Sequence, residues 1–505
     1  METTDILIVG TGAAGLFNAL QLPEHYQILL ITKEDADKAD SFLAQGGMCM
    51  LLNDDDYDSY FEDTMKAGHY ENNKQSVDIM IRSSQKIAQE LVDYGVDFER
   101  DAEGNFVFTR EGAHSENRIL FHEDLTGQEI TSKLLARARE RSNITIREHT
   151  TLVDILCDEN NVCHGGVVRE ADGTLHAIRS RAVVLATGGL GGLFRFSTNF
   201  RHIAGDALAI AMRHNIEVEH INYIQIHPTT LYTTKPGRSF LISESVRGEG
   251  AYLYNKDGKR FVNELLPRDV VANAIFEEMK KEGSEHVWLS LAPIPEEEIR
   301  KHFPNIYQKC LSIGIDITKE YIPVCPCAHY LCGGILVDLH AESSIHRLYA
   351  VGECSCTGLH GGNRLASNSL IEAVVYADAA AKHTLEVVDQ YDFNTAVPEW
   401  NDEGTMTNEE KVLIKQDMRE VGQTMSNYVG IVRSNLRLRR AWTRLDILYE
   451  ETEELFKRVK ATRDICELRN AINVGYLVTR QAIERKESRG LHYTIDYPRH
   501  AYDYK

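Results

Sequence analysis

A short apolar run near the N-terminus, Asp5-Ile6-Leu7-Ile8-Val9, leads directly into the glycine-rich segment GTGAAG at positions 10–15. This order predicts a buried parallel strand, a tight turn and a helix over residues 13–22. Gly10 would permit the turn, Gly12 would let the backbone approach a pyrophosphate, and Gly15 would let the helix pack closely on the strand. The first N–H groups of the helix would face phosphate. The arrangement favours a dinucleotide site over a purely structural turn.

The residue that usually completes such a site is missing. We expect the second strand over 27–32 (QILLIT), and an acidic side chain commonly follows it to hold the adenosine ribose. Here Lys33 comes first and Glu34 second. The turn alone therefore does not identify the dinucleotide.

The composition limits the kinds of partner. With 505 residues the chain is long enough for about two to four domains. Its 55 basic and 76 acidic residues give a net charge of −21, which argues against a nucleic-acid-binding surface. An acidic protein also repels small acidic substrates, so a dicarboxylate site would need its own arginines and histidines.

The expected location is the cytoplasm. No apolar run approaches the ~18 residues of a membrane span. The first strand begins within five residues of Met1, which leaves no room for a signal peptide. The ten cysteines lack the spacing of a disulfide module, as expected in a reducing compartment.

The pattern along the chain predicts an α/β fold with a discontinuous Rossmann-like domain. We expect this domain at 1–220 and 331–398, an inserted α+β capping domain at 221–330, and a C-terminal helical bundle at 399–505. Helical periodicity covers 75–100, 126–141, 408–427, 433–460 and 463–487, with a capping box at 126–129 (TGQE). Residues 144–185 alternate like a small antiparallel sheet, and 348–351 form a further strand.

Four polar segments carry the candidate chemistry. They are QIHPT at 225–229, SESVRGEG at 243–250 followed by PRD at 267–269, AHY at 328–330, and HGGNR at 360–364. Taken singly, such histidines and arginines are more often structural. Together they offer two guanidinium groups for bidentate carboxylate binding and imidazole donors for a second carboxylate. That combination suits a dianionic substrate.

The chain as a whole resembles the FAD-dependent fumarate reductase/succinate dehydrogenase flavoprotein family, and within it the L-aspartate oxidase branch. The matching segments are GTGAAGL (10–16), AQGG (44–47), REGAHS (110–115), ATGG (186–189), QIHPT (225–229), RGEGAYL (247–253), PRD (267–269), AHYLCGG (328–334), GLHGGNRLASNSL (358–370) and SRGLHYTIDYP (488–498). They occur in the family's order over nearly the whole chain.

The resemblance implies one FAD per chain. Covalently flavinylated relatives carry a histidine five residues before the AQGG glutamine, where this chain has Asp40, so we expect noncovalent binding. The implied cofactor residues are Gly10, Thr11, Gly12, Ala13, Ala14, Gly15, Lys33, Asp40, Ser41, Phe42, Leu43, Ala44, Gln45, Gly46, Gly47, Thr187, Gly188, Asp206, Glu353, Ser369 and Leu370.

The resemblance also implies a substrate site and a reaction. His227, His329 and Arg364 would hold the substrate carboxylates, with Gln225, Ser243 and Glu244 nearby. Arg268 would move a proton, and Glu111 would meet the substrate ammonium. The implied reaction transfers hydride from the L-aspartate Cα to FAD and gives 2-iminosuccinate, the first step of de novo NAD biosynthesis. O2, which would form hydrogen peroxide, or fumarate would reoxidise the flavin. Quinolinate synthase would take the product, and the protein would be a monomer or weak homo-oligomer without nucleic-acid or membrane partners.

Two other functions stay open at this point. The chain could be a soluble fumarate reductase or a succinate dehydrogenase flavoprotein subunit, in which Glu111 would have no amine to meet. It could also be a non-catalytic flavin-binding module. Five cysteines could also bind a metal: Cys325, Cys327, Cys332, Cys354 and Cys356. They are more simply explained as small packing residues, so no metal is expected.

Overall fold

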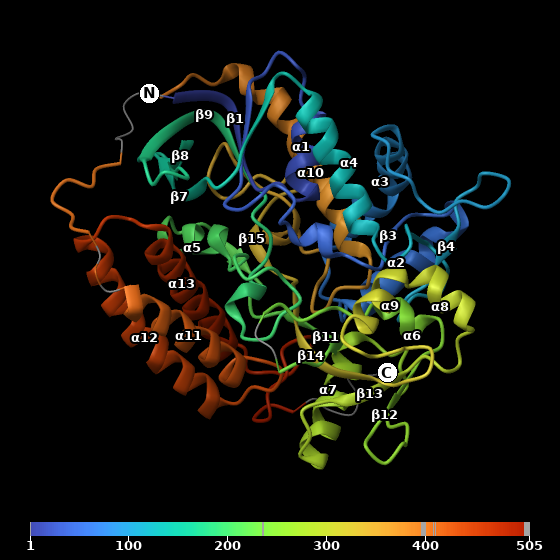
Figure 1. The fold of residues 1–505 in the computed structure, drawn as a ribbon. Coiled ribbons are helices and arrows are strands. Elements are labelled where there is room, and N and C mark those ends of the chain that lie inside the picture. The colour runs from blue at the N-terminus through green and yellow to red at the C-terminus, as the bar shows by residue number, and fades with distance from the viewer. Residues whose placement is uncertain (1, 235–236, 395–399, 408, 410, 499–505) are drawn as a thin grey trace.

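A computed structural model describes residues 2–234, 237–394, 400–407, 409 and 411–498. Its central element is a seven-stranded sheet (Figure 1). Strand β1 (Glu2–Val9) lies between β2 (Ile28–Ile31) and β9 (Leu175–Leu185), and all three run parallel. The turn after β1 leads into α1 (Ala13–Gln21). The predicted strand–turn–helix unit is therefore confirmed.

Two edges of this sheet differ in direction. Beyond β9, the strands β8 (Cys163–Arg169) and β7 (Thr151–Cys157) are antiparallel, as expected for this segment. The prediction is wrong for β6 (Ile144–Arg147), which pairs parallel to β2 at the opposite edge. Helix α4 (Thr126–Glu140) precedes β6 and makes it the end of a crossover connection, which favours parallel pairing.

The sheet is completed by a strand from much later in the sequence. β16 (Leu348–Ala350) pairs parallel with the second half of β9, through Val183 to Leu185. The expected strand at this position is confirmed, and so is the discontinuous α/β fold. Because the chain leaves the sheet after β9 and returns at β16, the intervening segments meet the carboxyl ends of the parallel strands.

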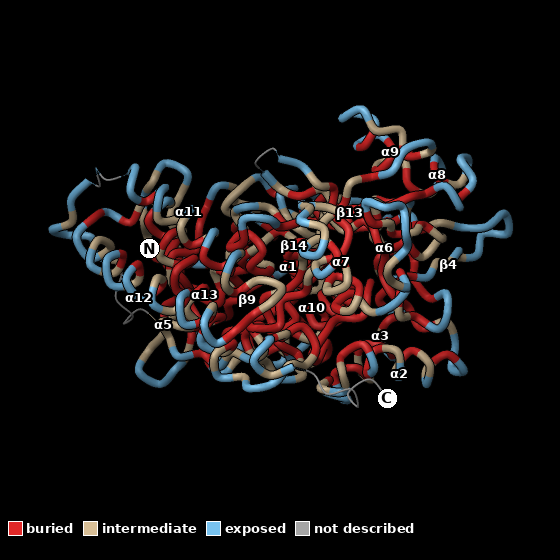
Figure 2. The backbone as a smooth tube through the Cα atoms, turned by 90° about the horizontal axis from the view of Figure 1, so that it is seen from below, coloured by how far each residue is buried: buried red, intermediate tan, exposed pale blue. Residues whose placement is uncertain are grey.

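Alternating side chains of β1 cover the two faces of the sheet. Ile6 and Ile8 belong to one apolar cluster with α1 and α10 (Asn368–Val387), whereas Leu7 and Val9 belong to another with α5 (Asp206–Arg213) and the C-terminal helices. Successive side chains of a strand point to opposite faces, so a fully apolar strand is buried on both. In Figure 2 buried backbone fills the middle of the molecule.

The inserted region has its own sheet and core. β11 (Ile224–Leu231), β14 (Ile322–Leu331), β13 (Val287–Ser290) and β12 (Tyr252–Tyr254) pair antiparallel in this order. A separate apolar cluster joins them to the helices of this region. The helices are α6 (Glu244–Gly248), α7 (Arg268–Glu282), α8 (Glu296–His302) and α9 (Pro304–Leu311).

The C-terminal segment forms three helices, α11 (Lys411–Tyr428), α12 (Asn435–Arg458) and α13 (Arg463–Glu484). They agree with the predicted helical segments, although positions 408 and 410 lie outside the described residues. Figure 1 shows them side by side, with α13 next to α5. No helix among the described residues is long and apolar enough to cross a membrane.

The other elements surround this framework. They are β3 (Met48–Cys49), α2 (Tyr57–Ala67), α3 (Lys74–Asp93), β4 (Phe108–Thr109), β5 (Ile119–Leu120), β10 (Val218–Glu219), β15 (Gly334–Leu336) and β17 (Ser355–Cys356). We propose to keep the domain limits at 1–220, 221–330, 331–398 and 399–505; the last boundary falls outside the described residues.

The capping box expected at 126–129 is wrong. The residue before α4 is Leu125, and no side chain caps the helix there. The Thr126 hydroxyl instead donates to the carbonyl of Gly46 at 3.1 Å, and the Glu129 carboxylate accepts from the backbone N–H of Asp97 at 3.0 Å. Tertiary contacts occupy both side chains that a capping box would use.

Candidate active site

One continuous cavity joins the turn after β1 to the polar residues of the inserted region. Most of the expected site residues line it: Gly10, Thr11, Gly12, Ala13, Ala14, Lys33, Asp40, Ser41, Leu43, Ala44, Gln45, Gly46, Gly47, Glu111, Thr187, Gly188, Asp206, His227, Ser243, Glu244, Arg268, His329, Glu353, Arg364, Ser369 and Leu370. Gly15, Phe42 and Gln225 do not line it. We call residues 10–14 with Thr187 and Gly188 the glycine end of the cavity. Arg268 and Arg364 with their polar neighbours form its arginine end.

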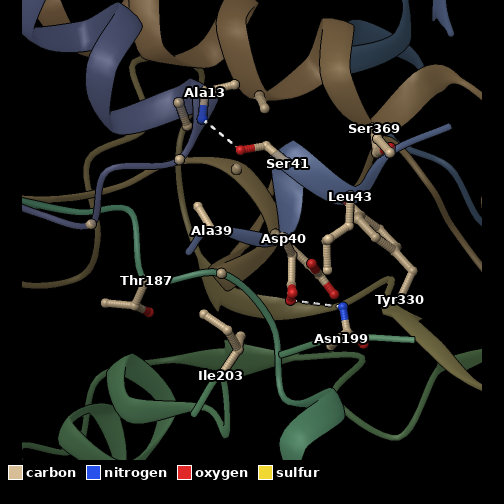
Figure 3. A pocket seen from close by; sticks show the side chains of 18 of the residues that line it. Ala13, Ala39, Asp40, Ser41, Leu43, Thr187, Asn199, Ile203, Tyr330 and Ser369 are labelled. Atoms are coloured by element: carbon tan, nitrogen blue, oxygen red, sulfur yellow. Dashed lines mark hydrogen bonds between the residues drawn. The ribbon is translucent and has the colours of Figure 1, made fainter. Parts of the chain in front are cut away.

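Backbone atoms build the glycine end. Gly10 has φ +119°, and a Cβ there would lie 2.1 Å from the Ala186 carbonyl oxygen. Gly12 precedes the first turn of α1, and the N–H of Ala13 donates to the Ser41 hydroxyl at 3.0 Å (Figure 3). Gly15 serves packing, because a Cβ there would lie 2.1 Å from the Gly10 carbonyl oxygen. The cavity therefore meets the N-terminus of α1 where Gly10 and Gly12 carry no side chains, which suits a phosphate group.

Lys33 and Glu34, in the segment that follows β2, have different partners. Lys33 forms an ion pair with Asp206 at 2.6 Å, and both side chains line the cavity. Glu34 pairs instead with Arg463 of α13 and does not line it. Asp206, from the start of α5, is thus the acidic partner of Lys33 that lines the cavity, while Glu467 of α13 lies 3.9 Å from the Lys33 ammonium.

Two half-buried carboxyl groups, Asp40 and Glu353, lie in the middle of the cavity. Asp40 accepts hydrogen bonds from the Asn199 amide at 2.7 Å and the Phe200 N–H at 2.8 Å (Figure 3). Burial outweighs these bonds and raises the pKa of Asp40 to about 6. Burial and the nearby Asp40 raise the pKa of Glu353 to about 8, so Glu353 is largely protonated at neutral pH.

At the arginine end, Gln225 connects two buried guanidinium groups. Its side-chain oxygen accepts from Arg268 Nη1 at 3.0 Å and from Arg364 Nε and Nη2 at 3.1 and 2.9 Å. Arg364 also donates to the Ser369 hydroxyl at 2.6 Å and lies over the Tyr330 ring. Because Gln225 lies behind the arginines, it orients them without lining the cavity itself.

Glu244 balances the charge of Arg268. Arg268 Nε donates to the Glu244 carboxylate, and both side chains are buried. Burial alone would raise the pKa of Glu244, but Arg268 and Arg247 outweigh it and lower that pKa. Glu244 accepts from Nε of the Arg268 guanidinium and Gln225 from Nη1. A guanidinium has five N–H donors in all.

Two histidines face each other beside the arginines. The ring centroids of His227 and His329 lie 5.1 Å apart, and the ring planes are inclined at 70°. The Thr198 hydroxyl pairs with His329 Nδ1 at 2.7 Å, whereas His227 Nε2 is buried and has no hydrogen-bond partner among the described residues. Burial and nearby positive charge, Arg268 included, lower the pKa of both imidazoles well below 6.5. Both are therefore neutral, and the unpartnered nitrogen is available to a ligand.

Glu111 is a buried carboxylate with hydroxyl partners. It accepts from Ser367 at 2.6 Å and from Ser245 at 3.2 Å. Within the described chain no lysine or arginine forms an ion pair with it. Burial and the neighbouring Glu244 raise the pKa of Glu111. A Cβ on Gly46 would lie 2.5 Å from the Glu111 carboxylate, so this glycine leaves room for it.

Comparison with known proteins identifies the family. Residues 5–370 match the FAD binding domain model and 418–503 match the model of the fumarate reductase flavoprotein C-terminus. L-aspartate oxidases from Pseudomonas aeruginosa and Clostridium perfringens are 41% and 48% identical, over 98% and 77% of this chain and 95% and 88% of their own lengths. A solved E. coli quinol fumarate reductase chain is 30% identical with a TM-score of 0.88, covering 99% of this chain and 93% of that one.

The chain belongs to the L-aspartate oxidase branch of the fumarate reductase/succinate dehydrogenase flavoprotein family. FAD is therefore its cofactor. The cavity fits this flavin, since Gly10 and Gly12 expose backbone at the glycine end and, in the part of the chain that the structure describes, the buried oxygens of Gln45 and Thr187 lack hydrogen-bond partners.

The sequence motifs did not predict several of the residues that line the cavity. They include Thr198, Asn199, Arg238, Tyr330 and Ser367. Tyr330 lies within the AHY segment, and Ser367 lies two residues before the expected Ser369. Their proximity to a motif is the sequence feature that could have identified them as lining residues. Thr198, Asn199 and Arg238 come from loops without any motif.

The five clustered cysteines are free thiols, and all except Cys325 are fully buried. Burial raises their pKa values to about 11 for Cys325 and Cys354 and to about 12 for Cys327, Cys332 and Cys356. Among the described residues, two groups could hold an ion: Glu219 with His220 and Cys356, and Glu2 with Glu170 and His176. Only Cys356 belongs to the cysteine cluster.

Proposed function

We propose that this protein oxidises L-aspartate to 2-iminosuccinate, with noncovalent FAD as the hydride acceptor. The family assignment supports this reaction, and one feature of the site carries the choice of substrate. Glu111 is a buried carboxyl group whose hydrogen-bond partners are hydroxyls, so among the described residues no cation is in direct ion-pair contact with it, although Arg268 and Arg364 lie close enough to oppose the rise in its pKa. The ammonium of an amino acid would supply that cation, whereas succinate would place further negative charge there.

Arg364 and the two histidines would bind the carboxylates. Gln225 and Ser369 fix the plane of the Arg364 guanidinium, which keeps its remaining N–H donors in one orientation. The neutral His227 and His329 would donate hydrogen bonds to the second carboxylate without adding charge to the buried site. Together with Glu111 they would fix the Cα–H of L-aspartate in one direction.

When bound, FAD supplies the two-electron chemistry. Arg268 would hold or deliver a proton at the substrate, and its bonds to Glu244 and Gln225 fix the position of its guanidinium. Reoxidation by O2 would form hydrogen peroxide, whereas fumarate would accept the hydride together with a proton from Arg268. The N-terminus of α10, where Ser369 and Leu370 lie, would favour negative charge on the flavin.

Anaerobic titration tests the proposal. Flavin absorbance of the holoenzyme should bleach with L-aspartate and stay unchanged with succinate or buffer alone. Bleaching by succinate and not by L-aspartate would instead identify a succinate dehydrogenase or fumarate reductase. Loss of all yellow colour on acid precipitation would support noncovalent binding, and retained colour would contradict it.

Location and partners are proposals too. Ten free thiols among the described residues support a reducing cytoplasm. Transfer of 2-iminosuccinate to quinolinate synthase, and a monomeric or weakly oligomeric state, stay predictions.

A further inference from the structure

Two cysteines outside the active site face each other across a hairpin. Cys157 ends β7 and Cys163 begins β8, and they are direct partners in the antiparallel register. The hairpin closes through the Asp158 N–H, which donates to the Val162 carbonyl, and the N–H of Cys163 donates to the backbone carbonyl of His346, outside the pair. The two cysteines are thus a non-hydrogen-bonded pair, and in such pairs the Cα atoms typically lie about 4.5 Å apart with both side chains on one face. This separation falls within the range that a disulfide spans.

The surroundings of Cys157 favour its thiolate. His214 of the α5 C-terminus contacts Cys157, and its Nε2 is 2.7 Å from the Asp154 carboxylate on β7. Asp154 also accepts from Arg213 Nε at 3.2 Å. Hydrogen bonding with Cys163, then with His214, lowers the pKa of Cys157 to about 6, although burial and Asp154 oppose the shift. Asp154 and Cys157 together raise the pKa of His214 to about 9, so the imidazolium persists at neutral pH.

Access also separates the two sulfurs. Cys157 is half-buried at the start of a loop whose residues 159–161 are exposed, whereas Cys163 is fully buried. A small oxidant can therefore reach Cys157 first. Cys163 then lies in position to attack the modified sulfur, as a resolving thiol does.

We propose that Cys157 and Cys163 form a peroxide-reactive dithiol, with Cys157 as the attacking sulfur and Cys163 as the resolving one. The Cys157 thiolate attacks one oxygen of hydrogen peroxide, the O–O bond breaks, and sulfenic acid and hydroxide form. The Cys163 sulfur, losing its proton, then attacks the Cys157 sulfur and expels hydroxide. In sum, two thiols and one hydrogen peroxide give one disulfide and two waters. The proposed reaction itself makes hydrogen peroxide whenever O2 accepts the electrons.

The chain contains a matched cysteine for comparison. Cys325 is half-buried like Cys157, but burial raises its pKa to about 11. Since the thiolate is the nucleophile, Cys325 should react at least roughly tenfold more slowly at neutral pH. Selectivity between Cys157 and Cys325 would therefore come from the hydrogen bonds and charge around Cys157 and not from exposure.

The experiment treats the holoenzyme with a small excess of hydrogen peroxide, without L-aspartate, so that its outcome is independent of the proposed activity. Free thiols are alkylated at intervals and the peptides mapped by mass. We expect a Cys157–Cys163 disulfide as the first product, reversed by dithiothreitol. Cys163→Ser should leave sulfenic acid at Cys157 that dimedone traps, Cys157→Ser should leave Cys163 reduced, and Cys325→Ser should behave like the wild type.

Three results would overturn the proposal. They are oxidation of other cysteines before Cys157, an unchanged rate of thiol loss in Cys157→Ser, and no dimedone adduct in Cys163→Ser. The wild-type map alone decides the first of these, so the test survives a variant that does not fold.

Discussion

The two ends of the cavity are built from different parts of the polypeptide. At the glycine end, most residues are consecutive in the turn after β1, and Gly10 and Gly12 contribute by lacking side chains. At the arginine end, buried charged side chains from distant segments neutralise one another, as Arg268 and Glu244 do. Backbone sites lose function when an atom is added. Networks of buried charge lose it when a group is removed, because the partner stays buried and unpaired.

The largest effect should come from removing Arg268. Arg268→Leu removes the proposed proton donor and leaves Glu244 without its closest cation, so turnover should fall by at least about 10³-fold. The glycine end is untouched, so the flavin content after purification should stay at one per chain. Arg268→Lys keeps the charge but loses the planar group, so its turnover should lie between that of the wild type and that of Arg268→Leu. Normal turnover of Arg268→Leu would remove the assigned role.

Adding a side-chain atom at the glycine end directly tests the contrast between the two ends of the cavity. Gly10→Ala would place a Cβ 2.1 Å from a carbonyl oxygen at φ +119°, so the turn must shift and most of the flavin should be lost. Gly104→Ala is the matched control, because Gly104 also has positive φ, +88°, but no atom lies within 4 Å of its Cβ. It should cost only about 1 kcal/mol of unfolding free energy and retain flavin. Equal flavin content in both variants would contradict the backbone role of Gly10.

The same contrast explains what the sequence could predict. The glycine end is local, so its strand, turn and helix could be read from spacing, and burial on both faces follows from the apolar run of β1. The position of Gln225 behind two arginines depends on how β11 approaches the loop that carries Arg364, which no local pattern encodes. The pairing of strand β6 differs from the prediction for a similar reason, since its alternation fits an antiparallel edge as well as a parallel one.

A smaller effect should distinguish the substrate ammonium from the carboxylates. Glu111→Gln keeps the shape and the hydroxyl contacts but removes the charge. A hydrogen bond to a charged group contributes about 1.5–3 kcal/mol, so kcat/KM for L-aspartate should fall roughly 10- to 100-fold. Inhibition by succinate should be unchanged or stronger, because the carboxylate-binding groups remain. Glu249→Gln, in a half-buried carboxylate outside the cavity that pairs with His302, should have wild-type kinetics.

If kcat/KM for L-aspartate and the affinity for succinate fell equally in Glu111→Gln, Glu111 would act on the carboxylate-binding groups as a whole. The assignment to the ammonium would then be wrong. Comparing the two ligands therefore separates a charge that selects the amine from one that only stabilises the arginine end.

The smallest effect concerns the middle of the cavity, where Glu353 belongs to neither end. Its pKa is raised to about 8 in the folded protein against an ordinary 4.5, so the folded state binds more protons than the unfolded state between these values. The unfolding free energy contributed by this group is thus fully present below pH 4.5 and is lost as the pH rises through about 8. In flavin-free protein, Glu353→Gln should flatten this decline, by a few kcal/mol at most. Urea unfolding of the wild type and Glu353→Gln from pH 5 to 9 measures this difference in unfolding free energy. Parallel plots of unfolding free energy against pH would show that Glu353 is already ionised in the folded protein. The middle of the cavity would then behave like the paired charges of the arginine end.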